Sequence, residues 1–386
     1  MTIELIKVRP DDIQINKPLP FSIYTADQSL LLKIGTVVAS EKQLTVLLEK
    51  GVYRNLTEQE IEQREAQNRE LDSEKLQTDP FATITHCVDT LDPLLQAIAE
   101  QTEQAAESRI VKLADLLRTV IVFDPNAALG AIHLLGCSNR YATTHSIYTA
   151  VLSGILGRRR QLADDEITVL IAAALTMNVG MLALQNQLYE QATPLTEEQR
   201  RSIAAHPTQS ALLLKQAGIA SSNWQEIVRQ HHEKNDGSGY PDRLSENSIC
   251  EGAKIVALAD VYTSLISGRK HRAPILAHDA IKSLFAKRGG EIDEMLASQF
   301  IREIGVYPPG TFVGLENGEI ALVTKRAVMK NNKPIGPYAM SLFSPRGAAY
   351  REPQKRDCGV PVFKISQSRP PLKGFASANA KKFWGY

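Results

Sequence analysis

The feature that most constrains this chain is a helical periodicity that runs from about Phe81 to Phe300 with almost no strand signals. Apolar residues there recur at intervals of three and four, which places them on one face of an α-helix. One such stripe follows Asp164, a candidate N-cap residue, and consists of Ile167, Leu170, Ile171, Ala174 and Leu175. The pattern predicts a mainly α fold, with a helical domain over residues 81–305.

Two further boundaries support helices in this range. Thr196 followed by Gln199 has the pattern of a capping box, and Leu195 stands at the position of a hydrophobic staple. A later apolar stripe runs from Ile255 to Ile266 and ends just before a glycine. Both segments are therefore expected to be helices.

The segment before the helical domain has a different pattern. Short β-rich runs at 3–8, 21–25 and 30–34 surround one helical stretch near Glu41 to Glu49. This mixture predicts a small α+β domain over residues 1–56. The next segment is almost entirely polar, which predicts a polar helical linker over 57–80.

The segment after the helical domain begins with Pro308 and Pro309, which interrupt the helical pattern. Residues 311–323 then have the pattern of a hairpin around Asn317-Gly318, which predicts a short C-terminal β extension over 306–350. The final 36 residues hold eight Lys or Arg and two Asp or Glu, with many Pro, Ser and Gly. We expect a basic, loosely ordered tail over 351–386.

The charge balance limits the partners. The 386 residues include 44 Lys and Arg against 43 Asp and Glu, a net charge of +1, so no overall field favours nucleic acid or an anionic membrane. No apolar stretch reaches the roughly 20 residues of a membrane span, and the N-terminus lacks the apolar core of a signal peptide. We predict a cytoplasmic protein without a membrane or a specific nucleic acid as partner.

The segment that carries most chemical information is HHEKNDGSGYP, from His231 to Pro241. Two neighbouring imidazoles on a helix point about 100° apart, so one metal binds both only where the backbone distorts or the helix ends. The Asp-Gly-Ser-Gly run that follows supplies such an end. Spacing alone leaves two readings open, a metal site or a polar loop with ordinary histidines.

This segment resembles the signature of the HD-GYP family, cyclic di-GMP phosphodiesterases built on the helical HD phosphohydrolase fold. Three other matches follow the family's order: RYATTHSIYTAVLSGIL with His145, PLTEEQRRSIAAHP with His206, and KIVALADVYTSLISGRKHR with Asp260. The resemblance covers roughly residues 139–305. The N-terminal module and the run YPPGTFVGLENGEIALV also resemble segments that flank many such domains.

The resemblance implies a buried cluster of two or three divalent metals, often iron or manganese, that binds phosphate and activates a water. By position, His145 and Asp260 would serve one metal. His206, His231 and His232 would serve another.

The chain departs from the family at the defining His-Asp pair. Where the family has a pattern like LLHDIGK, this chain reads LTMNVGM, with Met177, Asn178 and Met181 in place of the histidine, the aspartate and the lysine. A thioether binds hard divalent ions poorly, and a neutral amide replaces the bridging carboxylate. We therefore expect the first metal to be absent. For the second site two alternatives stay open, one divalent ion (Fe, Mn or Zn) or no metal.

Two other groups of residues match the family. Arg269 and Arg272 stand where arginines would pair with a phosphate, although cations at a helix C-terminus also interact favourably with its dipole. The loop residues are retained and would suit docking of a partner such as a GGDEF domain; they are Asp236, Gly237, Gly239, Tyr240 and Pro241.

These observations favour a signalling protein with impaired catalysis, which senses cyclic di-GMP or a related nucleotide or docks a protein. The alternative is an active cyclic di-GMP phosphodiesterase that uses a reduced metal site. A third hypothesis is a structural domain with neither ligand nor metal.

Overall fold

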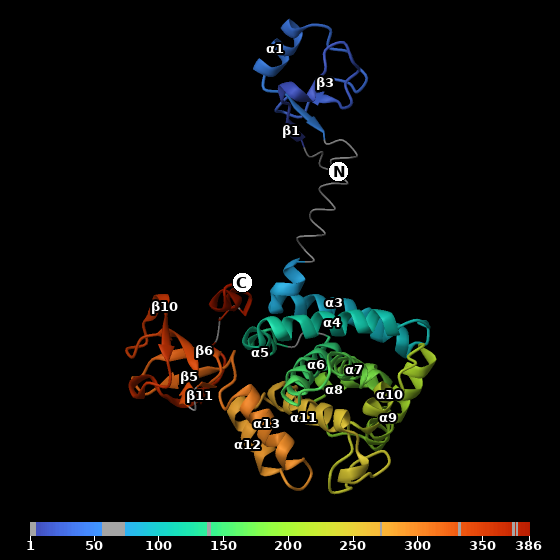
Figure 1. Cartoon of the computed structure of the whole chain (residues 1–386), viewed down its shortest axis with the longest axis vertical. Helices are drawn as coiled ribbons and strands as arrows, with labels where there is room; N and C mark the ends of the chain where they lie inside the picture. Colours follow the sequence, from blue (N-terminus) through green and yellow to red (C-terminus); the bar gives the residue numbers. More distant parts are fainter. Residues whose placement is uncertain are drawn as a thin grey trace. The chain divides into compact units, whose positions relative to one another are not determined.

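The computed structural model describes residues 5–55, 74–136, 140–270, 272–330, 333–372, 375 and 377–386. It divides into two compact units, Met1–Glu74 and Lys75–Tyr386. Figure 1 shows a small α+β unit, a helical domain and a C-terminal sheet. The predicted mainly α fold, with a small α+β domain before it and a β extension after it, is confirmed.

The N-terminal unit is an antiparallel four-stranded sheet, in the order β1-β4-β2-β3, with one helix. Its elements are β1 (Leu5–Lys7), β2 (Ile23–Tyr24), β3 (Leu30–Leu32), α1 (Glu41–Glu49) and β4 (Tyr53–Asn55). The hydroxyl of Ser40 caps α1 by accepting from the Gln43 amide. Three strands and the helix lie in the predicted runs. Strand β4 was not predicted; its sequence, Tyr-Arg-Asn, has polar residues at two of three positions and lacks the apolar run that marked the other three strands.

The helical domain contains the elements that position the candidate site. Its helices are α3 (Pro80–Ala99), α4 (Glu107–Phe123), α5 (Pro125–Leu134), α6 (Tyr141–Arg159), α7 (Asp164–Thr176), α8 (Leu182–Glu190), α9 (Glu197–Gln216), α10 (Ser222–Gln230), α11 (Glu251–Ile266), α12 (Ala277–Ala286) and α13 (Glu294–Ile304). The short 3-10 helix η2 (Val179–Met181) joins α7 to α8.

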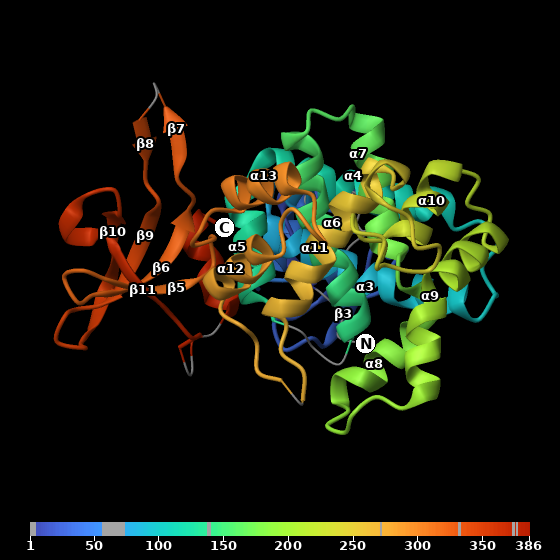
Figure 2. The same cartoon turned by 90° about the horizontal axis from the view of Figure 1, so that it is seen from below.

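Helix α6 lies in the interior of this domain (Figure 2). Every residue from Tyr141 to Gly157 is buried, because α3, α4, α7, α11 and α13 surround the helix. Gly154 permits this close packing, since a Cβ there would lie 2.8 Å from Ile121 Cδ1 and 2.9 Å from Ile171 Cδ1. A helix enclosed on all sides gives its polar side chains a fixed position in the core.

The predicted helix boundaries mostly hold. Thr196 caps α9, and the amide of Gln199 donates to its hydroxyl, as the capping-box pattern predicts. Helix α11 ends at Ile266. Asp164 is the first residue of α7 rather than its N-cap, which is Ala163, so that assignment was displaced by one position.

One helical run has the properties of a membrane span. Asp164–Glu190 is long enough, and its most apolar window has a mean hydropathy of 2.1, contrary to the expectation that no stretch suffices. However, 72% of that window is buried inside the folded unit, as in the core helix of a globular domain.

The C-terminal part of the same unit is an antiparallel five-stranded sheet in the order β10-β9-β6-β5-β11. Its strands are β5 (Phe312–Leu315), β6 (Ile320–Lys325), β9 (Tyr338–Phe343), β10 (Ala349–Asp357) and β11 (Ile365–Arg369), and a separate hairpin pairs β7 (Val328–Lys330) with β8 (Lys333–Ile335). The predicted hairpin is β5–β6, with Phe312 opposite Leu322. Gly318 in its turn has a φ of 87°, a conformation that favours glycine.

The prediction of a loosely ordered tail over 351–386 is wrong for the described residues. Most of β10 and all of β11 lie within this range, and the two strands form the opposite edges of the sheet. The 3-10 helix η5 (Ser377–Trp384) contacts α5 of the helical domain, and the Trp384 indole donates to the carbonyl of Thr324 on β6 at 2.9 Å. Edge strands expose many polar residues, so their composition resembles that of a disordered segment.

The other predicted domain limits are not settled by the fold. Most of the predicted linker, residues 57–73, lies outside the described residues, and residues 74–78 are helical. The limits at residues 56 and 305 stay predictions.

Candidate metal centre

Three histidines converge at the end of α10. His206 lies on α9, His231 is the C-cap of α10, and His232 follows directly. One ring nitrogen of each lies within 4.8 Å of the others, which groups them as a set able to hold a metal ion. Because α10 ends at His231, the two adjacent imidazoles are free to turn toward one another, with ring centroids 4.2 Å apart.

The hydrogen bonds of His206 and His231 define which nitrogens are available. Their Nδ1 atoms lie 2.6 Å from the carbonyl oxygens of Ile203 and Val228, and a carbonyl only accepts, so each Nδ1 donates. Their Nε2 atoms, 3.2 Å apart, then face one another with lone pairs. Two such lone pairs repel, and a cation between them would relieve the repulsion.

The protonation of these rings suits a metal. Burial, together with the neighbouring His231, lowers the pKa of His206 to about 3. Burial also lowers the pKa of His231 and His232, although the Asp260 carboxylate partly opposes this shift. All three imidazoles are therefore neutral near pH 7, the form that ligates metals.

The other predicted half of the centre consists of His145 on α6 and Asp260 on α11. The Nε2 of His145 lies 2.6 Å from Oδ1 of Asp260, so it carries a proton and donates to the carboxylate. Burial alone would raise the pKa of Asp260, but the hydrogen bond from His145 and the nearby imidazoles hold it below its ordinary value. The Nδ1 of His145 is buried and has no hydrogen-bond partner among the described residues.

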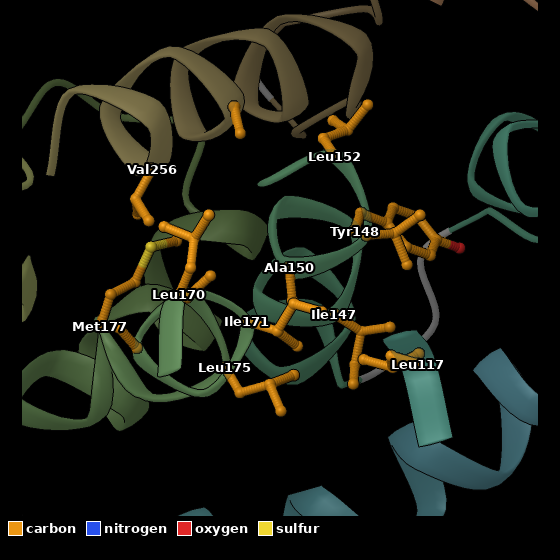
Figure 3. Close-up of a cluster of buried hydrophobic side chains, with 14 of the residues drawn as sticks. Leu117, Ile147, Tyr148, Ala150, Leu152, Leu170, Ile171, Leu175, Met177 and Val256 are labelled. Carbon is orange, nitrogen blue, oxygen red and sulfur yellow. The ribbon is translucent and has the colours of Figure 1, made fainter. Parts of the chain in front are cut away.

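The residues at the family's His-Asp position have a different environment. Met177 is the C-cap of α7, is fully buried and belongs to the hydrophobic core, as Figure 3 shows with Leu170 and Val256. Asn178 is 3% exposed, and among the described residues its side-chain oxygen has no hydrogen-bond partner. Met181, in η2, lines a surface cavity of about 660 Å³ between this segment and α9.

The two arginines lie just after α11. Arg269 and Arg272 pair through their backbones, and the guanidinium of Arg272 donates to the Ser264 carbonyl near the end of α11. The guanidinium of Arg269 lies 5.7 Å from the ring centroid of Tyr141, whose ring is in turn 5.6 Å from that of His145. Arg272 therefore hydrogen-bonds to the C-terminal turn of α11, whereas Arg269 lies over the ring of Tyr141, next to His145.

The loop after the histidines is fixed at Gly239 and Tyr240. A Cβ on Gly239 would lie 2.5 Å from backbone atoms of Glu233 and Lys234, so no larger residue fits without a shift. The ring of Tyr240 stacks on that of His232 with centroids 4.7 Å apart. Tyr240 thus covers a candidate metal ligand.

The remaining predicted docking residues lie around this point. Asp236 is exposed and accepts from the Ser238 amide at 2.9 Å. Gly237 has a φ of 75°, and Pro241 follows Tyr240 through a cis peptide bond. Their role in docking stays a prediction.

One residue that matters for this loop was missed by sequence reasoning. Glu233 is 5% exposed, and its two carboxylate oxygens accept from the amides of Asp242 at 2.6 Å and Leu244 at 2.9 Å. The only signal was its place after the paired histidines in HHEK. These two hydrogen bonds connect Glu233, directly after the histidine pair, to the loop residues Asp242 and Leu244.

Comparisons with known proteins agree with this geometry. Residues 128–296 match the family model described as HD domain. A cyclic di-GMP phosphodiesterase of Pseudomonas aeruginosa is 28% identical over 260 residues, covering 67% of this chain and 56% of that protein. A cyclic di-GMP phosphodiesterase response regulator of Xanthomonas campestris is 29% identical over 158 residues, covering 39% of this chain and 40% of that protein.

Among solved structures, a HDG"Y"P protein from Bdellovibrio bacteriovorus superimposes with a TM-score of 0.50. It is 18% identical and covers 77% of this chain and 98% of that one, which supports the fold alone. The matches to the first curated relatives span about half of their length or less. The fold and the matches define a protein with an HD domain. These matches support the resemblance of this chain to the HD-GYP family.

Proposed function

We propose that this protein acts in cyclic di-GMP signalling as a catalytically impaired HD-GYP protein that binds the dinucleotide or a related one. The observation that carries the proposal is the environment of Met177, which stands at the position of the family's metal-binding histidine and is buried in the apolar core. Asn178 beside it offers an amide where two metals need a bridging carboxylate. Met177 and Asn178 therefore provide no carboxylate that could bridge two metals.

The remaining histidines fit a single ion. His206, His231 and His232 present neutral nitrogens within 4.8 Å of one another, the donor set of a His-rich zinc, iron or manganese site. When bound, such an ion would attract phosphate oxygens and lower the pKa of a bound water. The three histidines would hold the ion, and Tyr240 shields one face of His232.

Ligand binding is supported by the surroundings of Arg269. A cyclic dinucleotide carries two phosphates and two purine bases, for which guanidinium groups and aromatic rings are the common partners in proteins. Arg269 lies over Tyr141, and Tyr141 stacks on Tyr189 with centroids 4.6 Å apart. Related proteins are named cyclic di-GMP phosphodiesterases, which favours this class of ligand. A GGDEF partner and a cytoplasmic location stay predictions.

A second candidate function is an active phosphodiesterase with a reduced metal site. The observation in its favour is that the three histidines are retained, with Asp260 close enough to oppose in part the lowering of the His231 pKa by burial. One metal with an open position is in principle sufficient to activate a water.

The deciding experiment measures hydrolysis and binding on the same preparation. Purified protein is supplied with iron, manganese or zinc and with cyclic di-GMP, and chromatography follows the linear dinucleotide and GMP while calorimetry measures affinity. We expect micromolar or tighter binding without product. Arg269→Ala should weaken binding about tenfold, which corresponds to about 1.4 kcal/mol. The exposed Arg302 on α13 provides the matched control, Arg302→Ala, which should leave the affinity unchanged.

Turnover that disappears in His231→Ala would establish the active enzyme instead. The absence of both turnover and binding would contradict both functions and favour a structural domain.

A further inference from the structure

A cavity of about 430 Å³ lies between the helical domain and the C-terminal sheet, within one compact unit. Its walls come from α5, α6, the segment between α11 and α12, and strands β5 and β11, which lie beside α12 in Figure 2. The volume is in the range of roughly 300–1,000 Å³ typical of small-molecule sites. None of the five candidate metal ligands lines it, although Tyr189, which stacks on Tyr141 beside Arg269, forms part of its wall.

The walls of this cavity are mostly apolar. The apolar lining includes Ile132, Ile266, Ile275, Leu276, Phe312 and Pro370. Among the described lining residues there is no Asp, Glu or Lys. The lining therefore favours an apolar body and supplies no acidic group to neutralise a cation.

The cation in this lining is Arg369, the last residue of β11. Its Nε is buried and has no hydrogen-bond partner in the part of the chain that the structure describes. The side chain lies across Gly314 of β5, where a Cβ would approach Nε to 3.2 Å. A buried guanidinium nitrogen without a partner is unfavourable, and an anion in the cavity would satisfy it.

The two histidines that line the cavity do not supply a further cation. His133 uses both ring nitrogens, Nδ1 toward the Leu129 carbonyl at 2.7 Å and Nε2 toward the Tyr262 hydroxyl at 2.9 Å. Burial lowers the pKa of His133 to about 4, so it is neutral near pH 7. His278 stacks on Tyr307 with centroids 4.7 Å apart. One fixed cation in an apolar cavity matches a ligand with one anionic group rather than a polyanion.

We propose that this cavity binds a small amphipathic organic anion, an apolar chain or ring with a carboxylate that pairs with Arg369. The inference does not rest on the proposed function. The cavity shares two helices with the candidate metal centre, because Tyr148 follows His145 on α6 and Ile266 follows Asp260 on α11. An occupant would therefore contact the helices that carry one half of that centre.

The test uses the full chain and two probes of equal length, decanoate and the uncharged 1-decanol, in calorimetric titrations. We expect decanoate to bind, and Arg369→Met to weaken it by about tenfold or more, as loss of a charge-assisted pair predicts. Decanol should be far less sensitive to that substitution. Arg346→Met, which removes an exposed arginine of the β9–β10 turn, is the matched control.

A second pair of variants tests the location of the probe. Leu276→Trp and Ala273→Trp fill the cavity from two partly or fully exposed positions, so at least one is expected to fold, which circular dichroism checks. Either folded variant should lose binding of both probes. Absence of decanoate binding, or decanoate binding that neither Arg369→Met nor a folded tryptophan variant weakens, would overturn the proposal.

Discussion

The two halves of the candidate metal centre lie on different helices and differ in what their nitrogens face. In one half, the Nε2 atoms of His206 and His231 present lone pairs to one another at 3.2 Å. In the other, the Nε2 of His145 donates to Asp260 at 2.6 Å and has no lone pair to offer a metal. In the first half two ring nitrogens face one another with lone pairs, whereas in the second the Nε2 of His145 is engaged by Asp260 and only its buried Nδ1 has no partner among the described residues.

The neighbourhood of each half explains this difference. At the position of the family's His-Asp pair the chain has Met177 and Asn178, and Met177 contributes to the hydrophobic core. The three-histidine half depends on α9, on the end of α10 and on the loop fixed by Gly239, none of which includes Met177. Separate elements allow one half of a metal site to change while the other is retained.

The largest effect is expected for His231→Ala. Removal of one of three convergent nitrogens should weaken metal binding by at least about a hundredfold, because loss of outer-shell partners alone costs 10–100-fold. Plasma mass spectrometry of protein purified with added iron, manganese or zinc measures this. His278→Ala, which removes a histidine outside the cluster, should retain the metal. Equal metal content in both variants would contradict the three-histidine site.

Restoring the missing His-Asp pair should supply the metal ligands that the half with His145 and Asp260 lacks. Met177→His combined with Asn178→Asp is expected to raise cyclic di-GMP hydrolysis at least about tenfold above that of the unchanged protein, since two metals then share a carboxylate. Burial of a histidine in the apolar core should lower the free energy of unfolding by about 1–3 kcal/mol.

The matched control for this restoration is Met177→His alone, which lacks the bridging carboxylate and should show no gain. If a folded double variant still failed to bind a second metal, other residues would be responsible for the loss of the first site. Metal content and chemical unfolding distinguish these outcomes.

A smaller effect is expected for Gly239→Ala, which disturbs only the three-histidine half. Its Cβ would meet the Glu233 and Lys234 backbone at 2.5 Å, and such overpacking lowers the free energy of unfolding by about 1–3 kcal/mol. The affinity for metal should fall as well, because the loop positions His232 and Tyr240. Ser238→Ala at the exposed neighbouring position should change neither quantity. An unchanged metal affinity in Gly239→Ala would show that the loop does not position the metal ligands.

The smallest effect is expected for Asp260→Asn. The asparagine oxygen still accepts from His145, so only the charge assistance is lost, and the free energy of unfolding should fall by about 1 kcal/mol. Metal retention by the three histidines should decrease far less than in His231→Ala. A comparable loss of metal would instead identify Asp260 as a ligand of that ion and weaken the contrast between the two halves.

Local sequence patterns predicted much of the fold. The capping box at Thr196, the end of α11 and the β5–β6 hairpin depend on residues a few positions apart, and the structure contains all three. The patterns failed where the environment is set by distant residues. The tail was predicted as loosely ordered, yet Lys381 pairs with Asp79 at 3.0 Å across 302 positions in the chain.

The candidate site shows the same division. The adjacent histidines and the change to Met177-Asn178 were evident from residue types and order, and they already indicated one retained and one lost half. The anchoring role of Glu233 and the unpaired Nε of Arg369 were not evident, since a sequence does not state which backbone amides or carboxylates meet a side chain.

By itself, the sequence determined the helical character, the family resemblance and the loss of the His-Asp pair, because these follow from periodicity and residue identity. Only the tertiary structure decided which histidine nitrogens face one another and that His145 donates a hydrogen bond to Asp260. It also decided that the guanidinium of Arg369 lines an apolar cavity. The physical reason is that burial, hydrogen-bond direction and charge pairing arise between helices and strands far apart in the chain.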